Sequence, residues 1–154
     1  DICVVTNLPY YITSKIITKI VSSSTPINRL VAMVQKEVAL KLCSEEKSPL
    51  KMMIDYVGDV QYELNVPRHV FMPAPHVDSA VISIHKERVI SQELIDLIEA
   101  SYTAKRKTLY NNLKPLYHDQ TKELLESCGI PANKRAEELN IDDYIRILER
   151  SHTL

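Results

Sequence analysis

Glycine is scarce in this sequence, with only Gly58 and Gly129 among its 154 residues. A loop that cradles a dinucleotide or a phosphate through several glycines is therefore excluded within this stretch. Tryptophan is absent, and phenylalanine occurs once. The three cysteines, Cys3, Cys43 and Cys128, show neither a disulfide framework nor zinc spacing. We therefore expect a reducing, cytoplasmic setting.

Long apolar runs are also lacking. No stretch approaches the roughly 20 residues that a membrane-spanning helix needs, and we expect no membrane association. The N-terminus has no basic segment ahead of an apolar one, so it does not resemble a signal peptide. It opens directly on a strand-like run, and we expect further residues upstream. The net charge of −1 gives no global sign of nucleic-acid binding, so any RNA affinity must come from local clusters.

The first half of the chain alternates between strand-like and helical patterns. Apolar runs predict strands at residues 2–5, 30–34 and 80–84, and alternating apolar and polar residues predict one at 60–66. Apolar residues at helical spacing predict helices over residues 12–21, 35–42 and 52–57. Gly58 would end the last of these in a left-handed conformation. The order predicts the rear half of an α/β sheet with an antiparallel edge.

No strand pattern follows Glu87, and four helices are predicted instead. Ser91 is expected to cap the first and Asn140 the last. The second would cover residues 105–113 and end by Pro115, and the third would close at Gly129. We therefore predict two domains, residues 1–87 and residues 88–154, of which the second is all-α.

The residues that point to chemistry directly follow the first strand: Asn7, Leu8, Pro9 and Tyr10. Ligands of α/β sheets bind at the carboxyl ends of strands. The amino nitrogen of adenine is a poor nucleophile, because its lone pair is delocalised into the ring. An Asn oxygen and a backbone carbonyl that accept its two N–H bonds would favour a pyramidal nitrogen facing a methyl donor. Asn-x-Pro is also common in ordinary turns, so a purely structural role stays open.

The only phenylalanine begins a proline-rich loop, Phe71 to Ser79, ahead of the last predicted strand. A base removed from its stack needs aromatic or apolar surfaces. Tyr10 and Phe71 could hold an adenine from opposite sides. Spacing alone equally allows Phe71 to be a core residue beneath the loop.

Five ordered motifs extend almost from end to end: Asn-Leu-Pro-Tyr-Tyr-Ile-Thr (7–13), Gln-Lys-Glu-Val-Ala (35–39), Phe-x-Pro-x-Pro-x-Val-Asp-Ser-Ala-Val (71–81), Arg-Lys-Thr-Leu-x-Asn (106–111) and Arg-Ala-Glu-Glu-Leu (135–139). In this order they resemble the bacterial small-subunit rRNA adenine N6,N6-dimethyltransferase family. The resemblance implies the rear half of a Rossmann-like S-adenosylmethionine-dependent methyltransferase sheet, followed by a small helical rRNA-binding domain.

The resemblance also implies an activity. Members of the family use S-adenosylmethionine to place two methyl groups on each of two neighbouring adenines near the 3′ end of small-subunit rRNA, in a pre-30S particle. By resemblance, Asn7, Leu8, Pro9 and Tyr10 are catalytic, Tyr10 and Phe71 contact the adenine, and Asn7 lies beside the cofactor. The family's glycine-rich cofactor loop lies upstream of the Asn-Leu-Pro-Tyr motif. We therefore expect this chain to lack the cofactor-binding half, to bind S-adenosylmethionine poorly, and to be monomeric.

A cluster of cations follows the predicted domain boundary. Lys105, Arg106 and Lys107 are consecutive, with Lys114 and Lys134-Arg135 further on. On a helix, the consecutive three would form a broad basic collar. Because residues 88–154 carry 10 Lys and Arg against 11 Asp and Glu, a merely solvated helix face is an alternative. The family resemblance favours contact with rRNA phosphates, which position an RNA without reading its sequence. The histidines show no metal-ligand spacing, and no metal site is expected.

Two other functions stay open. One is a non-enzymatic RNA-binding or ribosome-assembly module that keeps the adenine-facing surface without the donor site. The other is a large-subunit rRNA adenine methyltransferase that confers antibiotic resistance. The motif of that second class typically begins Asn-Ile-Pro-Tyr, and the Arg-Lys-Thr-Leu signature fits it poorly.

Overall fold

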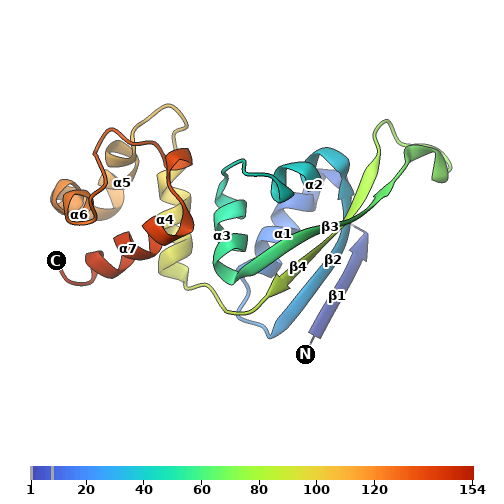
Figure 1. Cartoon of the computed structure of the whole chain (residues 1–154), viewed down its shortest axis with the longest axis horizontal. Coiled ribbons are helices and arrows are strands. Elements are labelled where there is room, and N and C mark those ends of the chain that lie inside the picture. The colour runs from blue at the N-terminus through green and yellow to red at the C-terminus, as the bar shows by residue number, and fades with distance from the viewer. Residues whose placement is uncertain (1, 8) are drawn as a thin grey trace. The chain divides into compact units, whose positions relative to one another are not determined.

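The chain groups into two compact units in the computed structural model, which describes residues 2–7 and 9–154 (Figure 1). The first unit takes in the residues up to Glu46 together with Ile54–Val89. The second consists of Lys47–Met53 and Ile90–Leu154. The division predicted from the sequence, between residues 87 and 88, keeps each domain contiguous and stays a proposal.

The first unit is built on a four-stranded sheet with the strand order β1-β2-β4-β3. Its strands are β1 (Ile2–Asn7), β2 (Ile27–Gln35), β3 (Gly58–Val66) and β4 (Ser79–Lys86). The β1–β2 pair is parallel, whereas β2–β4 and β4–β3 are antiparallel. The predicted α/β sheet with an antiparallel edge is confirmed.

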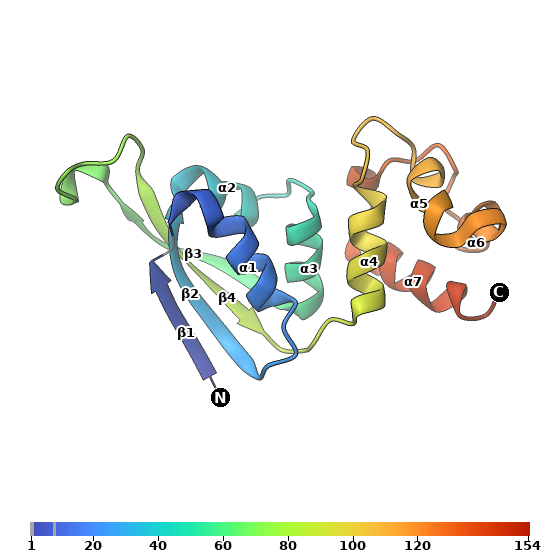
Figure 2. The ribbon, with the colours of Figure 1, turned by 180° about the vertical axis from the view of Figure 1, so that it is seen from behind.

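Helices cover one face of this sheet. The parallel strands β1 and β2 need a crossover connection, and α1 (Thr13–Val21) supplies it. Helix α2 (Lys36–Cys43) follows β2, and α3 (Pro49–Val57) precedes β3. Helices α1 and α2 lie behind the sheet in Figure 1 and in front of it in Figure 2. The residues buried beneath them are Leu30, Ala32 and Val34 of β2 and Ala80, Ile82 and Ile84 of β4.

The opposite face of the sheet is more open. Val5 pairs in register with Val31, and Leu64 with Val81, which places these residues on the face away from Leu30. Val5 is 75% exposed and Leu64 52% exposed. The sheet therefore keeps one buried and one partly solvent-exposed face.

The left-handed helix end predicted at Gly58 is wrong. The chain passes directly from α3 into β3 at this residue, and of the two glycines only Gly129 has a positive φ. A Cβ added at Gly58 would lie 1.8 Å from the backbone oxygen of His85 in β4. Gly58 is required because the β4 backbone passes so close, and no left-handed helix end is involved.

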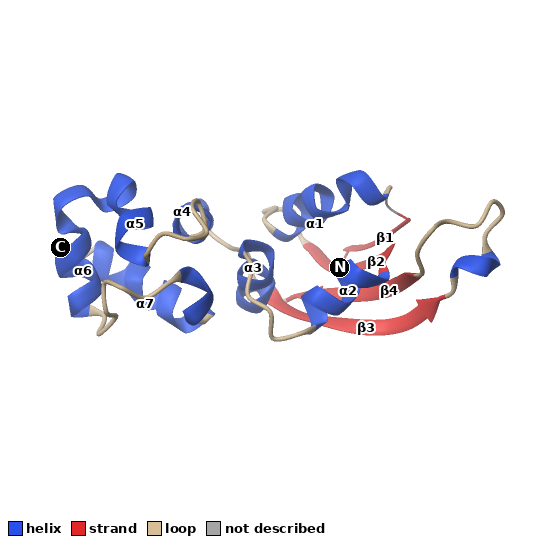
Figure 3. Ribbon diagram, turned by 90° about the horizontal axis from the view of Figure 1, so that it is seen from above, coloured by secondary structure: helices blue, strands red, loops and turns tan. Residues whose placement is uncertain are grey.

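The second unit is helical, as Figure 3 shows by its colouring. Besides residues 49–53 of α3, it contains the helices α4 (Gln92–Ser101), α5 (Leu109–Tyr117), α6 (Thr121–Ser127) and α7 (Ile141–Ser151). The Ser91 hydroxyl accepts a hydrogen bond from the Leu94 amide at 3.2 Å and caps α4. Asn140 and Asp143 form a reciprocal capping box on α7, and Gly129, with φ +71°, closes α6. These predicted helix ends are confirmed.

The predicted helix over residues 105–113 is wrong at both ends. The Thr108 hydroxyl accepts a hydrogen bond from the Asn111 amide at 3.3 Å, so α5 begins only after Thr108. Residues 105–107 form turns and bends ahead of it. Pro115 lies inside α5 and does not end it. The proline lacks only the amide hydrogen that would have reached the carbonyl of Asn111, four residues earlier.

Polar groups in the helical core are paired. Tyr144 is fully buried, and its hydroxyl lies 2.8 Å from that of Ser101, which in turn donates to the Ile98 carbonyl at 2.6 Å. Burial raises the pKa of Tyr144 far above its usual range, so the hydroxyl stays protonated. Throughout the described residues, no buried side-chain nitrogen or oxygen lacks a hydrogen-bond partner. In that same part of the chain, no helix has the length and apolar character needed to cross a membrane.

Candidate functional site

The Asn-Leu-Pro-Tyr turn begins at the carboxyl end of β1. Asn7 is the last residue of the strand, pairs in register with Met33 of β2 and is exposed. Leu8 lies outside the described residues, and so does the side chain of Tyr10. The roles predicted for these two therefore stay predictions.

The carbonyl oxygen of Pro9 is held by two donors. It accepts hydrogen bonds from the Ile12 amide at 3.2 Å and from the Thr13 hydroxyl at 3.0 Å. A carbonyl has two lone pairs, so these donors occupy its acceptor capacity. Thr13 is only 2% exposed, and its hydroxyl fixes the turn from inside. Sequence reasoning did not single out Thr13, although it is the last residue of the first motif.

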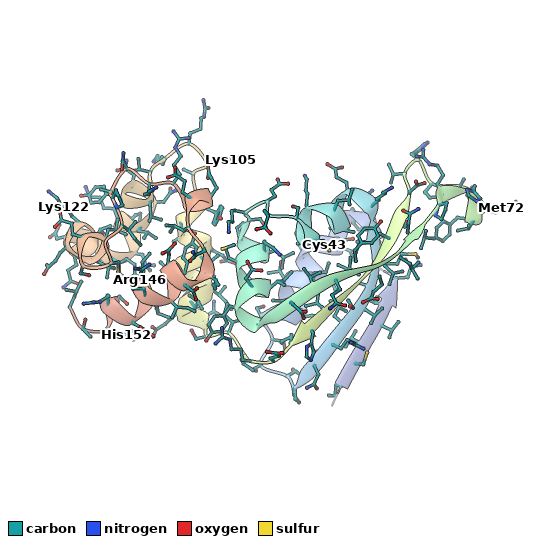
Figure 4. All side chains as sticks on the ribbon, in the orientation of Figure 1. Cys43, Met72, Lys105, Lys122, Arg146 and His152 are labelled. Atoms are coloured by element: carbon teal, nitrogen blue, oxygen red, sulfur yellow. The ribbon has the colours of Figure 1, made fainter. Side chains whose placement is uncertain are left out.

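The loop that carries Phe71 lies at the same end of the sheet. Asn7 pairs with Met33, and two residues further along β2 Gln35 pairs with Ser79, where β4 begins. Phe71 is half-buried. Its neighbour Met72, labelled in Figure 4 at the tip of the loop, is 98% exposed. The topology thus brings the two segments predicted to face the adenine to the same end of the sheet.

An ion pair ties the two ends of this loop together. Asp78 Oδ1 accepts hydrogen bonds from the Arg68 backbone amide at 2.9 Å and from Arg68 Nε at 3.1 Å. Arg68 Nη1 also donates to the His76 carbonyl at 2.6 Å. The Arg68 amide, followed by its guanidinium, holds the pKa of Asp78 below its usual value. The Lys36 amide donates to the Asp78 carbonyl at 3.0 Å, which joins the loop to the start of α2.

A hollow of about 610 Å³ lies between α2 and this loop. The side chains that line it are Lys36, Glu37, Leu40, Lys41, Ser44, Glu46, Arg68, Val77 and Asp78. Two of its cations already face carboxylates, Lys41 at 3.5 Å from Glu37 and Arg68 at 3.1 Å from Asp78. Its charges are balanced, so it has no strong preference for an anion.

Lys105, Arg106 and Lys107 lie on the loop between α4 and α5, and the predicted helical collar is wrong. All three are exposed, and Figure 4 shows Lys105 projecting outward from this loop. Asn112, which is 7% exposed, shapes the loop from beneath. Its Nδ2 donates to the carbonyls of Ser101 at 2.8 Å and Ala104 at 3.1 Å, and its Oδ1 accepts from the Ala104 amide at 3.2 Å. We call residues 105–107 the basic loop.

A second pair of cations lies beside the start of α5. The Leu109 amide donates to the carbonyl of Lys134 at 2.6 Å, which holds the segment with Lys134 and Arg135 against the end of the basic loop. Arg135 is exposed and Lys134 half-buried. The fold of the second unit therefore brings together two groups of cations that are far apart in the sequence, residues 105–107 and residues 134–135.

Two of the five histidines, His85 and His152, lie close to carboxylates. His85 Nδ1 lies 3.9 Å from Asp59 and 3.7 Å from Glu87, and His152 Nε2 lies 2.6 Å from Glu93. Over residues 2–7 and 9–154, no group of three or more His, Cys, Asp or Glu residues is arranged to hold a metal ion.

Comparison with known proteins identifies the family. The family model described as "Ribosomal RNA adenine dimethylase" matches residues 1–152. A relative from Fusobacterium nucleatum is 37% identical over 158 residues, which cover 95% of this chain and 60% of that protein. A relative from Bacillus cytotoxicus is 38% identical over 160 residues, covering 94% of this chain and 55% of that protein. Both are named "Ribosomal RNA small subunit methyltransferase A".

Two solved structures share the fold. A dimethyladenosine transferase from Plasmodium falciparum superposes with a TM-score of 0.82 at 23% identity, covering 99% of this chain and 67% of that one. The 23S rRNA methyltransferase ErmE superposes with a TM-score of 0.67 at 21% identity, covering 97% and 65%. The fold is that of a Rossmann-like methyltransferase, and the chain spans 55–62% of the length of the curated relatives it matches by sequence. With the family model matched over 152 residues, the chain belongs to the ribosomal RNA adenine dimethylase family.

Proposed function

We propose that this chain is the adenine-presenting and RNA-binding part of an S-adenosylmethionine-dependent rRNA adenine N6-dimethyltransferase. The substrate would be two adjacent adenines near the 3′ end of small-subunit rRNA, modified in a pre-30S particle by a monomeric enzyme. The observation that carries this proposal is the exposed Asn7 at the carboxyl end of β1, beside a turn fixed by Thr13.

Asn7 would act on the amino group of a flipped-out adenine. Its side-chain oxygen can accept one N–H bond of the amino group. Because the Pro9 carbonyl is already occupied by Ile12 and Thr13, the backbone acceptor for the second N–H would be Leu8. Two acceptors on one side of the nitrogen draw its lone pair out of the ring and direct it to the opposite side. No titrating base is needed for this step.

The half-buried Phe71 would flank the adenine ring from its loop. The Arg68–Asp78 pair holds both ends of that loop, so the ring would be presented by a fixed segment. Preorganisation of this kind lowers the entropic cost of positioning a base. The basic loop and the cations at residues 134 and 135 would contact rRNA phosphates.

S-adenosylmethionine, the proposed methyl donor, would need more than these residues. Gly58 lies against the backbone of β4 and Gly129 ends α6, so neither can form the glycine-rich turn on which such cofactors rest. Asn7 is the one contact we propose from this chain. The rest of the donor site would come from other residues of the full-length protein.

The experiment compares Asn7→Ala with wild type in a full-length protein that carries this sequence. Dimethyladenosine in small-subunit rRNA is measured by mass spectrometry, and RNA affinity is measured in parallel. Loss of one such hydrogen-bonding group should lower turnover by about 10²–10³-fold and leave RNA affinity within a factor of about two. Asn133→Ala, at an exposed loop position of the second unit, is the matched control.

Other outcomes separate the alternatives. Unchanged turnover in Asn7→Ala would remove Asn7 from the chemistry. RNA binding without any methylation by the full-length protein would favour a non-enzymatic assembly module. Methylation of large-subunit rRNA in place of small-subunit rRNA would favour the resistance-conferring class.

A further inference from the structure

A second hollow lies in the helical unit, next to the basic loop. Its volume is about 310 Å³, near the lower end of the ~300–1,000 Å³ typical of small-molecule pockets. Ala100, Ala104, Pro115 and Leu116 give it apolar walls, and Lys107 belongs to its lining. The pocket lies wholly within the second unit.

One polar side chain of this pocket, Asn111, has free hydrogen-bonding capacity. Asn111 lines it and is exposed, and its side-chain amide has no partner among the described residues. Pro115 has no amide hydrogen, so the backbone carbonyl of Asn111 lacks its regular helical donor. The pocket therefore offers the side-chain amide of Asn111, with its donor and its acceptor, and the ammonium of Lys107.

Asn112 keeps the pocket open. Its amide is fully engaged with the backbone at Ser101 and Ala104, the segment that forms one wall. Asn112 thus supports the wall, and ligand contacts are left to its neighbour Asn111. A wall fixed before binding reduces the ordering that a ligand must impose.

We propose that this pocket receives one unpaired nucleobase of an RNA loop, with its phosphate on Lys107. A base has flat faces that suit the apolar walls and an edge of donors and acceptors that suits Asn111. No carboxylate lines the pocket. A neighbouring hollow of about 270 Å³ in the same unit is lined by Glu93 and Asp96 and would repel a phosphate. This subsite rests on the RNA binding proposed above and adds to it a preference for unpaired nucleotides.

The test uses the 154-residue chain and two fluorescein-labelled RNAs, a short hairpin with a single-stranded adenine loop and a fully paired duplex of the same stem. Ala100→Leu fills the pocket without changing charge and suits its helix. It should weaken hairpin binding by about 5–30-fold, the equivalent of losing the burial of one apolar group, with the duplex affinity and the salt slope unchanged. Ala132→Leu, the same change at an exposed loop position outside the lining, should alter neither.

Asn111→Ala provides a second variant if Ala100→Leu lowers the melting temperature. Its side chain is exposed, so folding should persist while discrimination between hairpin and duplex falls. Equal weakening of both RNAs, or unchanged hairpin binding in a folded variant, overturns the pocket proposal and leaves the basic loop as a phosphate-binding surface. Failure of the wild-type chain to bind either RNA contradicts the proposed RNA-binding function itself.

Discussion

The two units differ in how completely each covers its own apolar surface. The sheet of the first unit buries one face under α1 and α2, but its other face carries Val5 and Leu64 at 75% and 52% exposure. Sheets with parallel strands in α/β proteins are normally covered on both faces. The helical unit instead surrounds fully buried residues such as Leu97 and Tyr144. The turn proposed to present an adenine thus belongs to a layer with an open face, whereas the loops proposed to bind RNA belong to a unit with a closed core.

Core truncations should have the largest effects and should separate the two units. Ile82→Ala removes a fully buried side chain of β4, and Leu97→Ala one of α4. Each should cost about 2–5 kcal/mol of folding free energy. We expect two unfolding transitions by calorimetry, with Ile82→Ala lowering the first unit's transition and Leu97→Ala the second's. Equal shifts of a single transition would show that the chain unfolds as one cooperative body.

Neutralising the basic loop should act on RNA binding alone. Replacing Lys105, Arg106 and Lys107 with alanine should lower the magnitude of the log–log salt slope by roughly 0.7–0.9 for each RNA phosphate that is no longer neutralised. The melting temperature should hold, because all three side chains are exposed. The matched control is a triple alanine variant of exposed cations elsewhere in the unit, Lys122, Arg146 and Arg150. If the salt slope of the control variant fell as much, RNA would contact exposed cations of this unit in general, and the basic loop would have no special role in RNA binding.

Elements governed by local rules could be predicted from the sequence. Ser91 and Asn140 cap helices through contacts three residues away, and Gly129 ends α6 with the positive φ that glycine favours. Apolar runs were sufficient to predict β1, β2 and β4, and the alternation of apolar and polar residues was sufficient to predict β3. The five sequence motifs and their order were sufficient to predict the family.

Features governed by contacts across the fold could not be predicted. Gly58 is explained by the backbone at His85, 27 positions away in the chain, and no local pattern reports such an approach. The start of α5 is different, because Thr108 caps it through the Asn111 amide only three residues away, a local signal that the predicted helix missed. Asn112 supports the basic loop through backbone groups eight and eleven residues earlier. Burial of its polar side chain is visible only once the helices are packed.

The turn at the candidate site offers a finer test. Thr13→Val keeps the shape of the side chain but removes one donor to the Pro9 carbonyl. Since a hydrogen bond contributes about 0.5–1.5 kcal/mol, turnover of a full-length protein should fall by up to about tenfold with RNA affinity unchanged. Thr13→Ser should restore it. Thr18→Val removes an equivalent bond, from Thr18 to the Ser14 carbonyl in the same helix, and should leave turnover intact.

The smallest expected effect is a pH dependence of the Phe71 loop. The pKa of Asp78 is below its usual 3.8, chiefly because the Arg68 amide and guanidinium bind the carboxylate. The folded state therefore binds this proton less tightly than the unfolded state, and the stabilisation is complete above about pH 4 and lost as the pH falls through the folded pKa. Asp78→Asn should be less stable than wild type at neutral pH, with the difference vanishing in acid. Asp119→Asn, at an exposed position, should show no such trend.

The division of labour between the two units is tested most directly by titrating the 154-residue chain with two ligands under the same conditions. Calorimetry with an RNA hairpin that has an unpaired loop should show salt-dependent binding, because the basic loop and its neighbouring cations lie on the closed helical unit. Titration with S-adenosylmethionine should show no binding in the low-micromolar range, because neither Gly58 nor Gly129 can form a cofactor turn. Low-micromolar binding of S-adenosylmethionine together with no affinity for RNA would contradict the account.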